Sequence, residues 1–193
     1  LAPIAAPNST TDSTVLEFDF IPLGAELSFS YVFGSEEYNE YVGSQFNDVF
    51  GFFVNGQNCA LLPGTTEEVA VNSVNNESNT AFYRDNTDAH LPTQLDGLTT
   101  VLTCTADVNK GQENTMKLAI SDRGDGNLDS AVILEADSFV ANTPPTAALA
   151  ADPTSGEAPL PVAFSTSGTG DAEGPLAAWS FDPGDGSPPQ TGS

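Results

Sequence analysis

Basic side chains are nearly absent from this sequence. Its 193 residues include only 4 Lys and Arg against 27 Asp and Glu, which gives a formal net charge of −23. Nucleic acids and anionic membranes attract basic patches, so this charge balance argues against both as partners. The acidic surface suits cation binding, high salt or plain solubility, and charge alone does not separate these.

The sequence also lacks the usual signatures of an enzyme or a membrane span. It contains no Gly-x-Ser-x-Gly, no phosphate-binding loop and no His/Cys zinc spacing. The only histidine, His90, lies in a polar segment without an indicated catalytic partner, so we expect it to be exposed. No apolar run is long enough to cross a bilayer, so we predict no direct membrane insertion. These absences favour a protein that is not an enzyme.

Sustained helical periodicity is missing as well, whereas short apolar and alternating runs recur along the chain. Leu16, Phe18 and Phe20 alternate with acids, as in a half-buried strand, and residues 49–54 are apolar on both faces, as in a central strand. A polar, Asn-rich connection of this length (72–96) is usually functional or mobile. The chain is therefore predicted to be all-β, with a jelly-roll-type β-sandwich. Strands are expected at 15–20, 26–33, 49–54, 59–62, 68–71, 97–108, 114–121 and 130–139.

The two cysteines, Cys59 and Cys104, indicate one disulfide in an exported protein or two free thiols in a cytosolic one. Cys104 falls on the inward-facing side of the expected strand 97–108, which favours a buried disulfide with Cys59. The opening residues resemble a mature N-terminus after removal of a signal. We therefore expect an extracellular or cell-surface location.

The segment from Tyr31 to Val54, YVFGSEEYNEYVGSQFNDVFGFFV, holds an acidic connection between two apolar runs. Its carboxylates repel one another unless they spread into solvent or share a cation, and calcium takes six to eight oxygen ligands. We therefore predict calcium as a cofactor here, with a solvated acidic loop as the alternative. The acidic residues are Glu36, Glu37, Glu40 and Asp48.

A second acidic group, Asp122, Asp125 and Asp129, lies in a glycine-rich turn between two expected strands. Glycine permits the tight backbone that directs oxygens to one point, although a polar hairpin turn explains the pattern too. The spacing is not that of an EF-hand. If the fold brings both groups together, one calcium is held by Glu36 or Glu37 with Asp48, Asp122 and Asp129, and Asn47 or Glu40 supplies further ligands.

Composition divides the chain into segments. Residues 1–13 are an extended lead-in, 14–140 a β-domain, 141–145 a proline-containing linker, and 146–193 a Pro- and Gly-rich β-module. Residues 1–140 carry 4 basic and 21 acidic residues, for a net charge of −17, and the remainder carries 6 acidic residues and no basic ones.

The pattern SEEY…FNDVFGFF…DGLTTVLTCTADV…SDRGDGNLDSAVILEADSF resembles the choice-of-anchor L domain from Thr14 to Phe139. Asn39 stands where that family often has proline, and the cysteines are not a fixed feature of it. The resemblance implies a secreted or surface-anchored prokaryotic protein and leaves its activity undefined.

The second module is similar to PKD (polycystic kidney disease) domains, through NTPPT, the stretch from Pro153 to Phe164, and WSFDPGDG at Trp179–Gly186. Pro183 interrupts the usual aromatic-Gly-Asp-Gly turn. The resemblance implies a partial immunoglobulin-like sandwich that acts as a spacer or adhesion unit and has an unpaired strand edge.

Together these features predict a calcium-stabilised module for adhesion or for the structure of a surface protein or appendage. Its partner is expected to be an extracellular glycan or protein, or a second copy paired through the PKD-like strands. One alternative is a calcium-dependent carbohydrate-binding module, and another is a glycoside hydrolase using paired carboxylates such as Glu36 and Glu40. The candidate ligand-binding residues are Tyr38, Glu40, Tyr41, Phe46 and Tyr83, whose aromatic members would equally serve packing.

Overall fold

The computed structural model describes residues 10–124, 126–171 and 175–192, and it is all-β, as predicted. The chain forms two compact units, Leu1–Ala141 and Asn142–Ser193, which are described separately below. No helix in these described ranges is long and apolar enough to cross a membrane.

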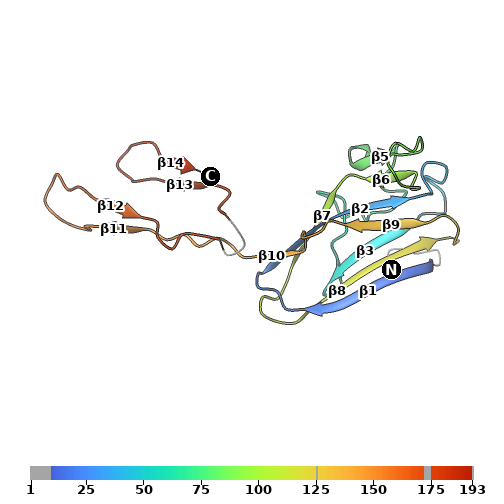
Figure 1. Cartoon of the computed structure of the whole chain (residues 1–193), viewed down its shortest axis with the longest axis horizontal. Helices are drawn as coiled ribbons and strands as arrows, with labels where there is room; N and C mark the ends of the chain where they lie inside the picture. The colour runs from blue at the N-terminus through green and yellow to red at the C-terminus, as the bar shows by residue number, and fades with distance from the viewer. Residues whose placement is uncertain (1–9, 125, 172–174, 193) are drawn as a thin grey trace. The chain divides into compact units, whose positions relative to one another are not determined.

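The first unit contains two antiparallel sheets (Figure 1). The first sheet has the strand order β1-β8-β3-β4, with β1 at one edge. Its strands are β1 (Thr10–Phe20), β8 (Asn114–Arg123), β3 (Val49–Val54) and β4 (Gln57–Asn58).

The second sheet is built around β2 (Glu26–Ser35). One side of β2 pairs with β7 (Leu102–Asp107) and β6 (Gly97–Thr99), and β6 pairs in turn with β5 (Tyr83–Asp85). On the other side lies β9 (Ser130–Leu134), and β10 (Val140–Asn142) also pairs with β2.

The core lies between these sheets and is rich in aromatic rings. The predicted inward face of β2 is confirmed: Leu27, Phe29, Tyr31 and Phe33 are all buried. The prediction that residues 49–54 form a central strand is confirmed too, because β3 lies between β8 and β4 and is almost wholly buried. The Phe29 and Phe52 rings meet across the two sheets with centroids 4.2 Å apart, an edge-on geometry that aromatic pairs prefer.

The predicted disulfide is present. Cys59 and Cys104 are bonded with their Cα atoms 5.2 Å apart, and Cys104 is fully buried in β7. The Cys59 N–H donates to the Phe52 carbonyl of β3, so the disulfide joins a segment held by the first sheet to a strand of the second.

The prediction of one strand over residues 97–108 is wrong, because β6 and β7 are separated at Thr100 and Val101. The Phe33 N–H donates to the Thr99 hydroxyl, and the Thr100 N–H donates to the Phe82 carbonyl. These bonds take the place of ladder bonds to β2 and leave Val101 exposed. Alternating apolar residues do not reveal such a break.

Three other predicted strands are shorter than expected. Residues 59–62 and 68–71 contribute only isolated bridges, Leu61 with Glu68 and Ala70 with Val49. The strand expected to run to residue 139 ends at Leu134. Beyond it, the Ser138 hydroxyl accepts from the Ser30 N–H and donates to the Glu135 carbonyl, which forms a turn against β2.

Strand β1 begins at Thr10 and is more exposed than the predicted half-buried strand. Leu16 and Phe18 pair in register with Leu118 and Met116 of β8, and so they do point to the inner side of the first sheet. They remain partly exposed because β1 is an edge strand.

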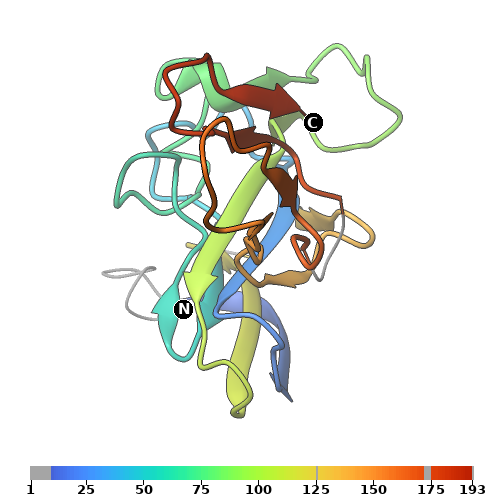
Figure 2. The same cartoon turned by 90° about the vertical axis from the view of Figure 1, so that its left-hand side faces the viewer.

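The long polar connection carries a short 3₁₀ turn, η1 (Thr80–Phe82), followed by β5. Phe82 and Tyr83 pack against the core, while the loop between β5 and β6 is drawn in light green in Figure 2. Asn86 organises this loop by donating to the Leu95 carbonyl and accepting from the Leu91 N–H. His90 is exposed, as predicted, and lies 3.8 Å from the Asp88 carboxylate.

The second unit consists of two two-stranded sheets. One pairs β11 (Ala150–Asp152) with β12 (Ala163–Ser165), and the other pairs β13 (Trp179–Phe181) with β14 (Gln190–Gly192). The Phe164 and Phe181 rings are 4.9 Å apart. None of the residues described in this unit is buried.

Candidate functional site

The candidate site is the end of the first unit at which β2 and β8 finish and β3 and β9 begin. Ser35 pairs with Ser130, and Val49 pairs with Ser121. The two predicted acidic groups therefore belong to segments 36–48 and 122–129, which connect these strand ends. We call these two segments the acidic end.

Asp48 lies at the centre of the acidic end with no exposed surface. One of its carboxylate oxygens accepts from the Arg123 N–H at 3.2 Å, and the other accepts from the Ser130 hydroxyl at 2.6 Å. Because charge-assisted hydrogen bonds are strong, these two bonds stabilise the contact of the Asp48 segment with β8 and β9.

The two predicted groups also meet at Glu36 and Asp129. The Glu36 N–H donates to the Asp129 carbonyl at 3.0 Å, and the Asp129 N–H donates to the Glu36 carboxylate, also at 3.0 Å. The fold therefore does bring the groups together, through backbone atoms of Asp129. The Asp129 side chain itself is exposed, and Asp122 is half-buried.

Glu37 is the second buried acid of this region, with 2% of its surface exposed. Its N–H donates to the hydroxyl of Ser35, the residue paired with Ser130. Asn47, also buried, donates its N–H to the Arg123 carbonyl and accepts from the Asn72 N–H through its side-chain oxygen. The acidic end is thus bonded to the 72–96 connection as well.

The candidate aromatic residues have different environments. Tyr38 is fully buried, and its hydroxyl donates to the Val74 carbonyl at 2.6 Å, so it packs inside the domain. Burial, followed by the nearby Tyr83 and Asp48, raises the pKa of Tyr38 far above its ordinary value. Tyr83 is half-buried and donates to the Asn39 side chain, and burial is the main cause that raises its pKa to about 12.

Glu40 and Tyr41 are exposed on the outside of the acidic end. The Tyr41 ring meets the half-buried Phe46 ring edge-on, with centroids 5.6 Å apart. Tyr41 is therefore the candidate aromatic residue with the most surface available to a ligand.

Sequence reasoning missed Asp85 and Asp96, which bring further negative charge to this region. The Asp96 N–H donates to the Ser35 carbonyl. Burial, then the charges of Glu40, Glu36 and Asp85, raises the pKa of Asp96. At Asp85, hydrogen bonds from the Thr87 N–H and hydroxyl lower the pKa. No local motif marks these acids, because the β5–β6 pairing is what brings them near Glu36 and Glu40.

Asp125, the remaining predicted ligand, lies outside the described residues. Within the described part of the chain, no group of three or more His, Cys, Asp or Glu side chains is arranged to hold a metal ion. What the acidic end does contain is two buried carboxylates, Asp48 and Glu37, beneath exposed acids.

Comparison with known proteins gives one match. The family model of the choice-of-anchor L domain matches residues 1–140, which is most of the chain. This match ends before the second unit, for which the PKD-like resemblance remains a prediction. Neither a curated protein nor a solved structure matches the chain.

Proposed function

The chain belongs to the choice-of-anchor L domain family, a family of cell-surface or extracellular modules that are not enzymes, and on that premise we propose a calcium-stabilised module for adhesion or for the structure of a surface protein or appendage. Calcium binds at the acidic end in this proposal. The proposed ligands are Glu36, Glu37, Asp48, Asp122, Asp125 and Asp129.

The burial of Asp48 and Glu37 is the observation that carries this proposal. An ionised carboxylate is costly to remove from water, and the cost grows when other acids lie nearby. The Asp48 carboxylate accepts from the Ser130 hydroxyl, and the Glu37 N–H donates to the hydroxyl of Ser35, which pairs with Ser130. Glu36 and Asp129 lie just outside these residues. A divalent cation at this place offsets the repulsion, and its preference for the folded chain raises stability.

Thermal unfolding of the full chain tests the proposal, in calcium, in magnesium and in a chelator. We expect calcium to raise the melting temperature by several degrees more than magnesium does. Asp48→Asn and Asp129→Asn should each remove most of this response, and the exposed Asp129 keeps the test valid if the Asp48 variant does not fold. A matched control is Glu113→Gln, an exposed acid at the opposite end of β8.

No calcium response, or an equal response in the two Asp variants and the control, would overturn the proposal. An equal effect of magnesium would reduce it to general screening of negative charge.

Adhesion or assembly is proposed to involve the second unit. Two-stranded sheets are marginally stable alone, and Phe164 and Trp179 are exposed there. Strands from a second copy would cover them by pairing with the open edges of these sheets. Sedimentation of the full chain with calcium should then show association that increases with concentration. A strict monomer at high concentration would contradict this part of the proposal.

The carbohydrate-binding alternative rests on Tyr41, since Tyr38 is buried and Tyr83 is hydrogen-bonded to Asn39. Exposed aromatic rings are typical platforms for sugars, and calcium would then position the loop. If this alternative holds, Tyr41→Ala should abolish binding on a glycan array while the melting temperature changes little. The absence of any calcium-dependent glycan signal would exclude it.

A further inference from the structure

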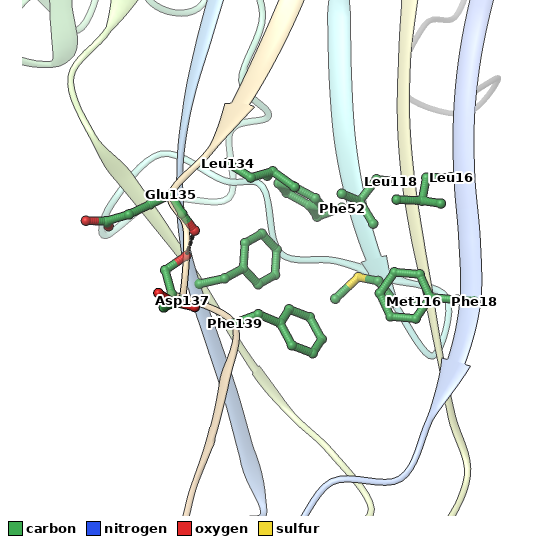
Figure 3. A pocket seen from close by; sticks show the side chains of 11 residues that line it. Leu16, Phe18, Phe52, Met116, Leu118, Leu134, Glu135, Asp137 and Phe139 are labelled. Carbon is green, nitrogen blue, oxygen red and sulfur yellow. Dashed lines mark hydrogen bonds between the residues drawn. The ribbon is translucent and has the colours of Figure 1, made fainter. Parts of the chain in front are cut away.

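An apolar cleft opens along one side of the first unit, between β1 of the first sheet and the β9–β10 connection of the second. Its volume is about 130 Å³. Figure 3 shows Leu16 and Phe18 on one side and Leu134 and Phe139 on the other, with Met116 between them. Leu16 is 55% exposed although it points to the inner side of its sheet.

The cleft lies beside an open strand edge. Strand β1 pairs with β8 alone among the strands that the structure describes. In an antiparallel pair each strand uses only half of its backbone groups, so alternate N–H and carbonyl groups of residues 14–20 point away from β8. The same region thus offers a backbone edge for pairing and an apolar space beside it.

The geometry of strand pairing indicates which side chains would fill this space. Residues directly opposite each other on paired strands point to the same face. Residues opposite Leu16 and Phe18 would therefore enter the cleft, and residues opposite Glu17 and Asp19 would lie on the outer face. An occupant of this edge needs apolar residues at every second position.

The charges around the cleft indicate which residues of the docked segment would alternate with its apolar residues. Glu17 and Asp19 are on the outer face of β1, and the exposed Glu135 and Asp137 line the cleft from the connection between β9 and β10. Lys117 pairs with Glu17 at 3.1 Å, but both are well exposed and such a pair is weak. A second copy paired along β1 would place its own Glu17 and Asp19 against Glu17 and Asp19 of the first copy. Each copy also carries a net charge of −23. Charge complementarity therefore favours a basic partner over self-pairing.

We propose that β1 and the adjoining cleft form a docking site for an extended segment of another protein in which basic and apolar residues alternate. The segment adds a strand to the edge of β1, places apolar side chains between Leu16 and Leu134, and sets Lys or Arg against Glu17 and Asp19. This site is separate from the acidic end and does not depend on calcium.

Titration of the full chain with the nine-residue peptide TKLKFKLKT, followed by calorimetry and by amide NMR shifts, tests this site. We expect micromolar binding that weakens as salt is raised, with shifts concentrated in residues 14–20 and 131–139. The peptide TKKLLFKKT, which has the same composition but places its three apolar residues next to one another, should bind at least about tenfold more weakly. Equal binding of both peptides, no binding, or shifts located elsewhere would overturn the proposal.

Two matched comparisons separate this site from general attraction to an acidic protein. Leu16→Lys places a cation over the cleft and should weaken binding at least about tenfold. Leu23→Lys makes the same change at a leucine that is 79% exposed in the β1–β2 turn, and it should have little effect. Similar losses in both variants would contradict the proposal.

Methylation of the peptide backbone tests strand pairing itself. In an added strand, alternate N–H groups face β1 and the others face solvent. Of two peptides N-methylated at alternate positions, one should retain binding and the other should lose it. Retention by both or loss by both would show that no strand is added.

Discussion

The Asp48 carboxylate accepts a 2.6 Å hydrogen bond from the Ser130 hydroxyl, across 82 residues of sequence. Asp48 directly precedes β3 of the first sheet, and Ser130 begins β9 of the second. This bond therefore ties the two layers of the sandwich together at the acidic end.

Ser130→Ala should lower the free energy of unfolding by about 1–3 kcal/mol, because it removes a hydrogen bond to a buried carboxylate. Denaturant unfolding measures this loss. Ser78→Ala, at an exposed position of the long connection, should stay within about 0.5 kcal/mol of the parent chain. Equal effects of the two substitutions would show that the Asp48–Ser130 bond contributes nothing.

Reduction of the Cys59–Cys104 disulfide should destabilise the chain by about 4 kcal/mol, the loop-entropy expectation for its separation of 45 residues. Unfolding curves with and without a phosphine reductant measure the difference. The double variant Cys59→Ala/Cys104→Ala should be similarly destabilised and insensitive to reductant. Unchanged unfolding of the parent chain after verified reduction would contradict the prediction.

Asp96→Asn should raise the melting temperature at pH 7, by roughly 1–3 °C. Burial, then Glu40, Glu36 and Asp85, raises the folded-state pKa of Asp96 above its ordinary value of 3.8. The folded chain therefore holds the carboxyl proton of Asp96 more tightly than the unfolded chain does. The contribution of Asp96 to stability is present below its unfolded-state pKa and falls as the pH rises from there through the higher folded-state pKa.

The gain from Asp96→Asn should accordingly disappear below pH 3.8 and shrink at high salt. Asp107→Asn, at an exposed residue of β7, is the matched control. A pH-independent gain would assign the effect to packing, and a loss of stability at pH 7 would contradict the predicted repulsion.

Gly97→Ala should destabilise the chain by about 1–3 kcal/mol. A Cβ atom at Gly97 would lie 2.5 Å from the buried Tyr38 ring and 2.7 Å from the Tyr83 ring, closer than such atoms approach. Thermal or denaturant unfolding measures the cost. Gly170→Ala places its Cβ in open space and should be nearly neutral, so a neutral Gly97→Ala would show that the two tyrosines readily move.

Local patterns predicted much of the fold, and the reason is physical. Residues alternate in β2 because only one face of that strand meets the core, and β3 is apolar throughout because both of its faces are buried. The buried positions of Phe29 and Phe52 were therefore predicted correctly. The Cys59–Cys104 disulfide followed from the inward position of Cys104. The break at Thr100 was not predictable, because it depends on bonds from Phe33 and to Phe82, which are distant in sequence.

The sequence by itself determined the all-β class, the acidic character and the family resemblance, because composition and periodicity are local properties. Only the tertiary structure decided which carboxylates are buried: Asp48 and Glu37 resemble Glu40 in sequence, yet Glu40 is exposed. The meeting of Asp96 with Glu36, and the apolar cleft beside Leu16, likewise depend on which strands become neighbours and which edges stay open. Those choices are made by packing between segments far apart in the chain, which no short stretch encodes.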